Sequence, residues 1–245
     1  MTPQFNKETA VISLDGNLSA ENLILKTIYR HLFIYSTTDP NAVKMQNSGR
    51  HCVEYCNLFL IILPEDYGLQ SILWEDFYLY YGNLFESIID VEHNILCIKR
   101  LYTHIQKRIQ VTEKTRILDF GCGSGLAVTL DAKCEVIGYE PNKTMRVQAV
   151  KKGMKVLDAC QICGMPDHDI DAVFASYVFH MGLDDRDIEI LSRIVRPNGI
   201  VVANFYKDMN CHIVNNIFRR KGFFVKKIMG SDKGFGSIYE YYKKR

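Results

Sequence analysis

The spacing of apolar side chains changes character about halfway along the chain. In the first half apolar residues recur at steps of three and four, which is typical of amphipathic helices. We expect one helix to begin near Ser19, a second to cover residues 70–89 and a third to cover residues 94–110. A turn at Pro40 separates the first helix from the rest. Residues 1–112 are therefore predicted to form a mainly helical N-terminal extension.

Over residues 113–245, short apolar runs alternate with amphipathic segments. This alternation predicts an α/β fold in which parallel strands are joined by crossover helices on both faces of one sheet. The expected strands are residues 116–120, 134–139, 155–157, 172–176, 200–205, 223–228 and 237–242. A short Gly-rich connection, residues 229–236, joins the last two strands. These two should form an antiparallel C-terminal hairpin at the sheet edge.

A glycine-rich loop, Gly121-Cys122-Gly123-Ser124-Gly125, follows the first of these strands. Glycines at alternate positions let the backbone approach a ligand where any Cβ atom would collide. A helix is expected to begin near Leu126, so its free amides would point at the same ligand. The next strand ends at Glu140, whose carboxylate is placed to accept hydrogen bonds from both hydroxyls of a ribose. A dinucleotide fingerprint would require a small residue where this chain has Leu126, so a different nucleotide-like cofactor is favoured.

The segment Leu118-Asp119-Phe120-Gly121-Cys122-Gly123-Ser124-Gly125, followed by Glu140, resembles the first two motifs of class I S-adenosylmethionine-dependent methyltransferases. Segments 157–159, 169–176 and 191–199 resemble the later motifs of that family, in the same order. The resemblance covers residues 116–245. It implies a Rossmann-like, seven-stranded, mostly parallel sheet, an enzyme that transfers methyl groups, and S-adenosylmethionine as its cofactor.

The resemblance also implies roles for individual residues. The cofactor-binding set that it implies is Asp119, Gly121, Gly123, Gly125, Glu140, Asp158, Ala159 and Ser176. Within this set Asp119 would lie near the methionine end of the cofactor, Asp158 and Ala159 near the adenine, and Ser176 beneath the transferred methyl. The alternative for Asp158 is an ordinary solvated loop acid, because most acidic side chains are exposed.

His180 is the candidate catalytic base. Methyl transfer from a sulfonium is an in-line displacement with a good leaving group, so positioning supplies much of the acceleration. A base is needed only when the acceptor must lose a proton. His180 lies four residues beyond Ser176, and a neutral imidazole there would take such a proton. The alternative is a structural histidine whose ring nitrogens bond to backbone groups.

An aromatic stripe lies within the second predicted helix. Its members recur at steps of three and four and are Trp74, Phe77, Tyr78, Tyr81 and Phe85. A flat acceptor would stack on such a face, which makes Tyr78, Tyr81 and, after the fourth strand, Tyr177 candidate substrate residues. In that interpretation the extension is a mobile lid over the acceptor. In the alternative, the stripe simply docks the extension onto the sheet domain.

The place after the fourth strand reads Ala175-Ser176-Tyr177-Val178, without the Asn/Asp-Pro-Pro-Tyr sequence of enzymes that methylate exocyclic amines of bases. The ends of the fourth and fifth strands carry Ser176 and Asn204 instead of metal-binding carboxylates. We therefore expect a small, aromatic or apolar acceptor and no metal. The alternatives are an RNA or protein methyltransferase that uses the extension for recognition, and a non-catalytic cofactor-binding partner protein.

The composition bears on partners and location. Lys and Arg total 30 against 28 Asp and Glu, a net charge of +2, so no nucleic-acid partner is favoured. The N-terminus lacks a secretory pattern, and the strongest apolar run, residues 58–63, is too short to cross a membrane. Eight scattered cysteines, with Cys122 inside the glycine loop, indicate a reducing cytoplasm. Cys160 and Cys163 have metal-ligand spacing, but a second such pair is missing. The oligomeric state stays open.

Overall fold

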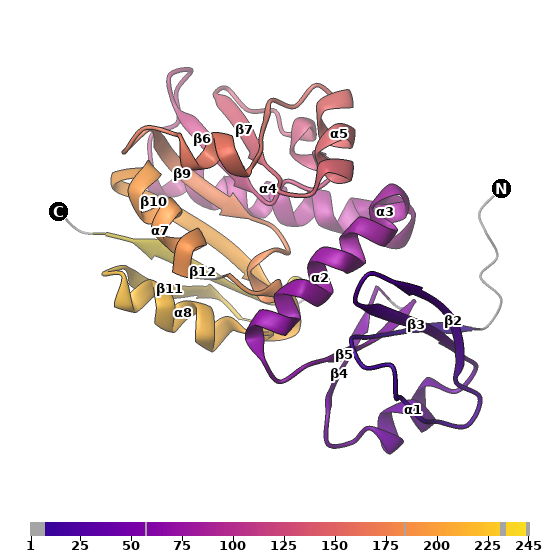
Figure 1. Cartoon of the computed structure of the whole chain (residues 1–245). Coiled ribbons are helices and arrows are strands. Elements are labelled where there is room, and N and C mark those ends of the chain that lie inside the picture. Colours follow the sequence, from indigo (N-terminus) through magenta and orange to yellow (C-terminus); the bar gives the residue numbers. More distant parts are fainter. Residues whose placement is uncertain (1–7, 57, 184, 231–233, 244–245) are drawn as a thin grey trace. The chain divides into compact units, whose positions relative to one another are not determined.

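The structure, a computed structural model, describes residues 8–56, 58–183, 185–230 and 234–243. The chain divides into two compact units, Met1–Asp90 and Val91–Arg245 (Figure 1). The unit boundary thus precedes the helix at residues 91–108 instead of following it, as the predicted boundary at residue 112 would require. None of the helices within the described residues combines the length and the apolar character needed to cross a membrane.

The first unit is built on a five-stranded sheet, so the prediction of a mainly helical extension was wrong. Its strands are β1 (Thr9–Ser13), β2 (Ile24–Tyr29), β3 (Leu32–Thr37), β4 (His51–Tyr55) and β5 (Phe59–Leu63), in the spatial order β2-β3-β1-β5-β4. Strands β1 and β5 are parallel, and the other pairs are antiparallel. Its helices are α1 (Pro40–Gln46), α2 (Tyr67–Tyr81), the 3-10 turn η1 (Gly82–Leu84) and α3 (Phe85–Ile88).

The helix expected to begin near Ser19 is instead the β2–β3 hairpin. Its turn is Arg30-His31, with Arg30 in the left-handed region at φ 51°. No Gly, Asn or Asp marks this turn, which is why the sequence pattern did not reveal it. The turn is fixed from outside, because the buried Asp76 carboxylate of α2 accepts hydrogen bonds from the His31 backbone and ring and pairs with the Arg30 guanidinium.

The aromatic stripe of α2 packs inside the first unit. Trp74 and Phe77 are buried, and their rings contact Tyr55 of β4, while Phe77 and Tyr81 contact Phe59 of β5. An apolar helix stripe faces the nearest core, which here is the unit's own sheet. The stripe therefore completes a local core.

The second unit contains all seven predicted strands. They are β6 (Arg116–Phe120), β7 (Glu135–Tyr139), β8 (Val156–Leu157), β9 (Ile170–Ala175), β10 (Val195–Phe205), β11 (Phe224–Met229) and β12 (Ser237–Tyr242). Their spatial order is β11-β12-β10-β9-β6-β7-β8 (Figure 1). Strand β12 is antiparallel to both β10 and β11, and the remaining pairs are parallel. The predicted mostly parallel sheet with an antiparallel C-terminal hairpin is confirmed.

Helices cover both faces of this sheet. They are α4 (Val91–Arg108), the turn η2 (Leu126–Thr129), α5 (Lys143–Lys151), α6 (Ala159–Cys163), the turn η3 (Phe179–Met181), α7 (Asp185–Ile194), the turn η4 (Tyr206–Asp208) and α8 (Cys211–Arg220). Because successive side chains of a strand point to opposite faces of the sheet, the core is divided between the two faces. Leu118 and Val173 pack with α7 and α8, whereas α4 lies against β9 and β10 and contributes nothing to that cluster.

Gly236 directly precedes the return strand β12 and makes a close approach to the end of β10. Its φ is 71°, and a Cβ atom there would lie 1.7 Å from the Phe205 carbonyl oxygen. Gly222 offers a matched control, because its φ is 83° but a Cβ atom would meet nothing within 4 Å. Both Gly→Ala changes place an alanine in the left-handed backbone region, which costs about 1–2 kcal/mol. We expect Gly236→Ala to lower the free energy of unfolding by about 1–3 kcal/mol more than Gly222→Ala, as overpacking does. Urea unfolding of both variants measures the difference, and equal losses would contradict it.

Candidate functional site

The candidate site lies at the carboxyl ends of the parallel strands. Strand β6 is followed in the chain by β7 on one side of it in the sheet, while β9 pairs with its other side. The loops after β6 and β9 therefore leave the sheet in opposite directions. In α/β sheets such a switch point is where ligands bind.

The glycine loop after β6 is held against β7 by its backbone. The Gly121 and Cys122 amides both donate to the Tyr139 carbonyl, at 2.8 and 2.9 Å. Gly121, Gly123 and Gly125 all have left-handed φ, at 76°, 55° and 81°. A Cβ atom on Gly121 would lie 2.5 Å from the Val178 side chain, and one on Gly125 would lie 2.8 Å from the Ala149 backbone of α5. These two glycines are thus required by the protein's own packing as well as by any ligand.

The helix expected after the loop is only a single 3-10 turn, η2, which begins at the predicted residue, Leu126. A turn of four residues has few free amides and no appreciable dipole. The predicted array of helix amides above the strand ends is therefore absent from η2, and ligand binding falls to the loop and to β7.

Glu140, directly after β7, is joined to the glycine loop. Its Oε2 accepts from the Gly123 amide at 2.9 Å, and its Oε1 accepts from the Asn142 amide at 2.8 Å. The Arg146 guanidinium of α5 donates to the Glu140 carbonyl at 2.6 Å. Burial is the largest influence on this carboxyl and raises its pKa to about 7 despite those amides and Arg146. Each carboxylate oxygen keeps a second lone pair for a ligand donor.

Asp119, the acidic residue of β6, is the second carboxyl of the site. It is 2% exposed. Burial, and after it the charge of Glu140, raises the Asp119 pKa well above its ordinary value. Two such carboxyls without a buried cation beside them favour neutral forms. A ligand that brings positive charge would restore their ionisation.

Asn142 is a site residue that the motif analysis missed. Its Oδ1 caps α5 by accepting from the Thr144 and Met145 amides, at 2.9 and 3.1 Å. Its Nδ2 is buried, and among the described residues it has no hydrogen-bond partner. A buried donor left without a partner costs about 1–3 kcal/mol unless a ligand accepts from it. The pair of Glu140 as acceptor and Asn142 as donor fits a ribose diol.

Asp158 and Ala159 lie at the start of α6. The Asp158 carboxylate accepts from the Gln161 amide at 2.8 Å, while the Gln161 side chain accepts from the Asp158 amide at 2.9 Å. This capping box gives Asp158 a helix-capping role that neither earlier interpretation included. Ala159 is exposed. Their contact with adenine stays a prediction.

Tyr177, after β9, has a strained backbone at φ 56°. Its amide donates to Asn204 Oδ1 at 2.7 Å, and the Asn204 amide group donates to the Phe235 carbonyl at 2.8 Å. The Tyr177 ring lies near those of Tyr206, at 6.3 Å between centroids, and His93, at 6.4 Å. These three residues, 177, 206 and 93, form an aromatic wall at the strand ends. Sequence spacing could not place His93 there, because α4 precedes the sheet.

The thiol of Cys97, on α4, lies beside Ser176 and Tyr177. Burial raises its pKa to about 11, so this thiol is neutral near pH 7. Ser176 thus lies directly after β9 and in contact with α4.

His180 lies in η3 and is fully buried. Burial alone lowers its pKa to about 3, and its ring packs 5.6 Å from that of Tyr206. A neutral imidazole with so low a pKa is a weak proton acceptor at pH 7. This environment disfavours His180 as the base, and its structural role stays a prediction.

The structure brings some of the predicted residues together and places others in the first unit. Asp119, Gly121, Gly123 and Glu140 come together at the ends of β6 and β7. Tyr78 and Tyr81 belong to the first unit, where the Tyr78 hydroxyl bonds to that of Tyr55 at 2.7 Å and burial raises the Tyr81 pKa to about 12. Within the described residues, no three His, Cys, Asp or Glu side chains gather as a metal cluster.

Comparisons with known proteins agree with this geometry. Residues 118–203 match the family model described as a methyltransferase domain. An uncharacterized methyltransferase of Schizosaccharomyces pombe is 30% identical over 132 residues, which cover 48% of this chain and 50% of the relative. The chain thus spans about half the length of the curated relative that it matches.

Similar proteins occur among the solved structures. A putative S-adenosyl-L-methionine-dependent methyltransferase from Methanococcus maripaludis is 12% identical, with a TM-score of 0.50 over 75% of this chain and 96% of that one. A putative methyltransferase solved in complex with the Haloferax volcanii Trm112 activator is 15% identical, with a TM-score of 0.49 over 69% of this chain and 98% of that one. The matching family model over residues 118–203, the strand order and the glycine loop bonded to Glu140 all agree with a class I S-adenosylmethionine-dependent methyltransferase fold in the second unit.

Proposed function

We propose that this chain transfers a methyl group from S-adenosylmethionine to an acceptor with a flat aromatic or apolar group. The observation that carries the proposal is the Glu140 carboxylate, buried and bonded to the glycine loop, with the unpartnered Asn142 donor beside it. Together they offer an acceptor and a donor to the two hydroxyls of a ribose. Gly123 and Asp119 complete the cofactor side of the site.

The charge of the site suits a cationic cofactor. S-adenosylmethionine supplies a methyl group on a positively charged sulfur. Asp119 and Glu140 are both buried, and both pKa values are raised. A positive charge nearby favours the ionised form of each carboxyl. Their role is therefore to bind and orient, because in-line displacement gains most from correct alignment.

The acceptor would lie against the aromatic wall formed by Tyr177, Tyr206 and His93. Three rings at the strand ends offer flat apolar area with polar edges, which suits a planar group. The neutral Cys97 thiol of α4 contacts Ser176 and Tyr177, so the wall adjoins the strand ends that would frame the cofactor site. The acceptor itself is identified by incubating the protein with methyl-labelled cofactor and fractionated small molecules, RNA and protein. Failure to label any fraction, with the cofactor bound, would overturn the proposed activity.

Cofactor binding should release protons near pH 7. A ribose that donates to Glu140 favours its charged form, so the carboxyl's pKa falls from about 7 on binding and its proton leaves. Affinity should therefore rise from pH 6 to 8 and then level off. Calorimetry in buffers of different ionisation heat measures the released fraction.

Two variants give the matched comparison for this proton release. Glu140→Gln should remove most of the release and weaken binding by about 1.5–3 kcal/mol, the scale for hydrogen bonds to charged groups. Glu135→Gln, at the start of the same strand and paired with Lys155 and Arg116, should change neither. Affinity that is independent of pH in the unmodified protein would contradict this role for Glu140.

His180→Ala should reduce stability more than rate. Removing a fully buried ring leaves a cavity, which costs about 3–5 kcal/mol by analogy with other ring-to-alanine changes. Because the His180 pKa is about 3, the rate profile of the unmodified enzyme should show no ionisation from it between pH 5 and 8. Melting temperature and single-turnover rate on one preparation measure both effects. A loss of rate of about a hundredfold in the folded variant would restore His180 as the base.

The first unit is proposed to cover the bound acceptor, as predicted for residues 1–112. Its aromatic stripe is committed to its own core, so other residues of the unit would face the acceptor. Cofactor and acceptor together should slow amide exchange in the first unit more than the cofactor alone. Hydrogen exchange with mass spectrometry tests this, and protection confined to residues after 91 would rule out a cover.

A further inference from the structure

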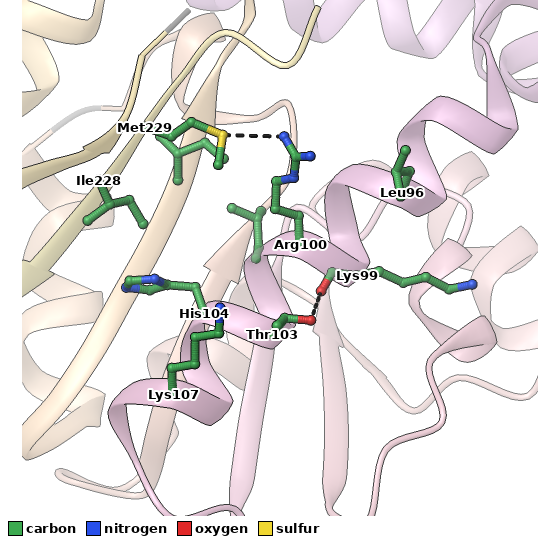
Figure 2. A pocket seen from close by; sticks show the side chains of 10 residues that line it. Leu96, Lys99, Arg100, Thr103, His104, Lys107, Ile228 and Met229 are labelled. Atoms are coloured by element: carbon green, nitrogen blue, oxygen red, sulfur yellow. Dashed lines mark hydrogen bonds between the residues drawn. The ribbon is translucent and has the colours of Figure 1, made fainter. Parts of the chain in front are cut away.

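A groove lies between α4 and the hairpin formed by β11 and β12, on the edge of the sheet away from the glycine loop. Its volume is about 400 Å3. Figure 2 shows Arg100, His104 and Lys107 along one side of α4, with Ile228 and Met229 of β11 across from them and Lys99 on the outer side of the helix. All of these residues belong to the second unit.

The groove is basic, because its lining includes Lys99, Arg100, His104 and Lys107 and, among the residues that the structure describes, no acidic side chain. Among the residues that the structure describes, neither lysine nor Arg100 forms an ion pair. The nearby acid, Glu240 of β12, already has partners of its own.

Glu240 is 1% exposed, and its Oε2 accepts from His104 at 2.6 Å and from Arg108 at 2.9 Å. Burial acts to raise the Glu240 pKa, but these two hydrogen bonds outweigh it and lower that pKa. The carboxylate thus has Arg108 and His104 as its partners, and among the described residues Lys99, Arg100 and Lys107 have no acidic partner.

Arg100 is held in place without an acidic partner among the described residues. Its guanidinium lies 4.5 Å above the Phe235 ring and donates to Met229 Sδ at 3.3 Å. Phe235 is itself stacked against His93 at 4.3 Å. Stacking and a weak sulfur contact fix the planar group but leave most of its donors available. An ordered guanidinium of this kind suits an oxyanion with fixed geometry, such as a phosphate ester.

The charge of the chain is divided between its units. Residues 1–90 carry 5 Lys and Arg against 11 Asp and Glu, a net −6, whereas residues 91–245 carry 25 against 17, a net +8. The whole-chain value of +2 conceals this division. The argument from overall charge against a nucleic-acid partner therefore does not apply to the second unit taken by itself.

We propose that this groove binds the phosphate backbone of a single-stranded polynucleotide. Arg100 and Lys107 lie seven residues apart on one helix face, about 10 Å along the axis, so one ligand needs more than one anionic group to meet both. The apolar wall of Ile228 and Met229 provides contact for sugars or bases between the phosphates. Farther along β11, the exposed Phe224 ring stacks on Tyr242, which gives a strand a place to stack a base.

The groove leads toward the proposed acceptor site. Helix α4 carries Cys97 beside Ser176 and Tyr177, and one turn later it carries Arg100 in the groove. A strand bound along α4 would therefore present a base to the aromatic wall, a planar group of the kind proposed above. This last step rests on the proposed function, whereas binding in the groove does not, and the two are tested separately.

The test measures binding of a fluorescent ten-nucleotide oligouridine to the full chain by anisotropy, without cofactor, over a series of salt concentrations. The groove variant is Arg100→Glu with Lys107→Glu, at the two cations proposed to meet the phosphates, both of them accessible side chains. The matched control is Lys151→Glu with Arg219→Glu, also exposed, on α5 and α8, which makes the same change in net charge elsewhere. We expect the groove variant to bind at least about tenfold more weakly, with the salt exponent reduced by about 1.4 for two lost contacts. The control should stay within about threefold of the unmodified protein.

Several results would overturn the proposal. The first is that the oligonucleotide does not bind at low salt, and the second is that both double variants lose the same oligonucleotide affinity. The third is that uridine monophosphate or polyglutamate displaces the labelled oligonucleotide as effectively as the unlabelled oligonucleotide does. Arg100→Lys keeps the positive charge but removes the planar guanidinium with its paired N–H donors, so it should weaken oligonucleotide binding by at least about threefold. S-adenosylmethionine affinity, unchanged in all variants, reports that the fold is intact. Oligonucleotide binding with no cofactor binding would reject the proposed function and leave the groove assignment standing.

Discussion

The bond from the Gly123 amide to the Glu140 carboxylate is the constraint on which the site depends. It ties the loop after β6 to the end of β7, and the glycine loop can close onto β7 only with three left-handed residues. Burying a carboxyl is unfavourable unless hydrogen bonds or charge compensate it. Here two amides and Arg146 compensate only in part, so the carboxyl stays poised between its two protonation states. The Glu140 carboxyl thus contributes both to cofactor recognition and to the stability of the loop.

Much of the second unit could be predicted because its signals are local. Buried parallel strands read as short apolar runs, and Gly121, Gly123 and Glu140 mark two successive strand ends. The first unit was misread because Leu25, Ile28, Leu32 and Phe33 imitate helical spacing while lying on two strands of a hairpin. Its turn is fixed by Asp76, some 45 residues away, and no sequence window contains that interaction.

The site residues that the sequence analysis missed also depend on contacts that the local sequence does not show. Asn142 looks like an ordinary helix cap, and only the burial of its Nδ2 atom shows a donor without a partner. His93 reaches the aromatic wall through the packing of α4 against the sheet. His180 has the right sequence position for a base, but full burial makes its imidazole a poor one. Burial and long-range packing, which spacing does not encode, decide each of these roles.

The strained Tyr177 backbone has a consequence for how this enzyme family can diversify. Asn204 holds the Tyr177 amide with one end of its side chain and the Phe235 carbonyl with the other, so the segment after β9 and the β11–β12 connection share one anchor. Replacement of residues around this connection would re-aim the Tyr177 ring while the glycine loop and Glu140, on other strands, kept their places. If the acceptor binds against the Tyr177 ring as proposed, selection on acceptor choice could act on the hairpin connection independently of the nucleotide-binding half, and descendants of one ancestral cofactor site could acquire different acceptors through that connection alone.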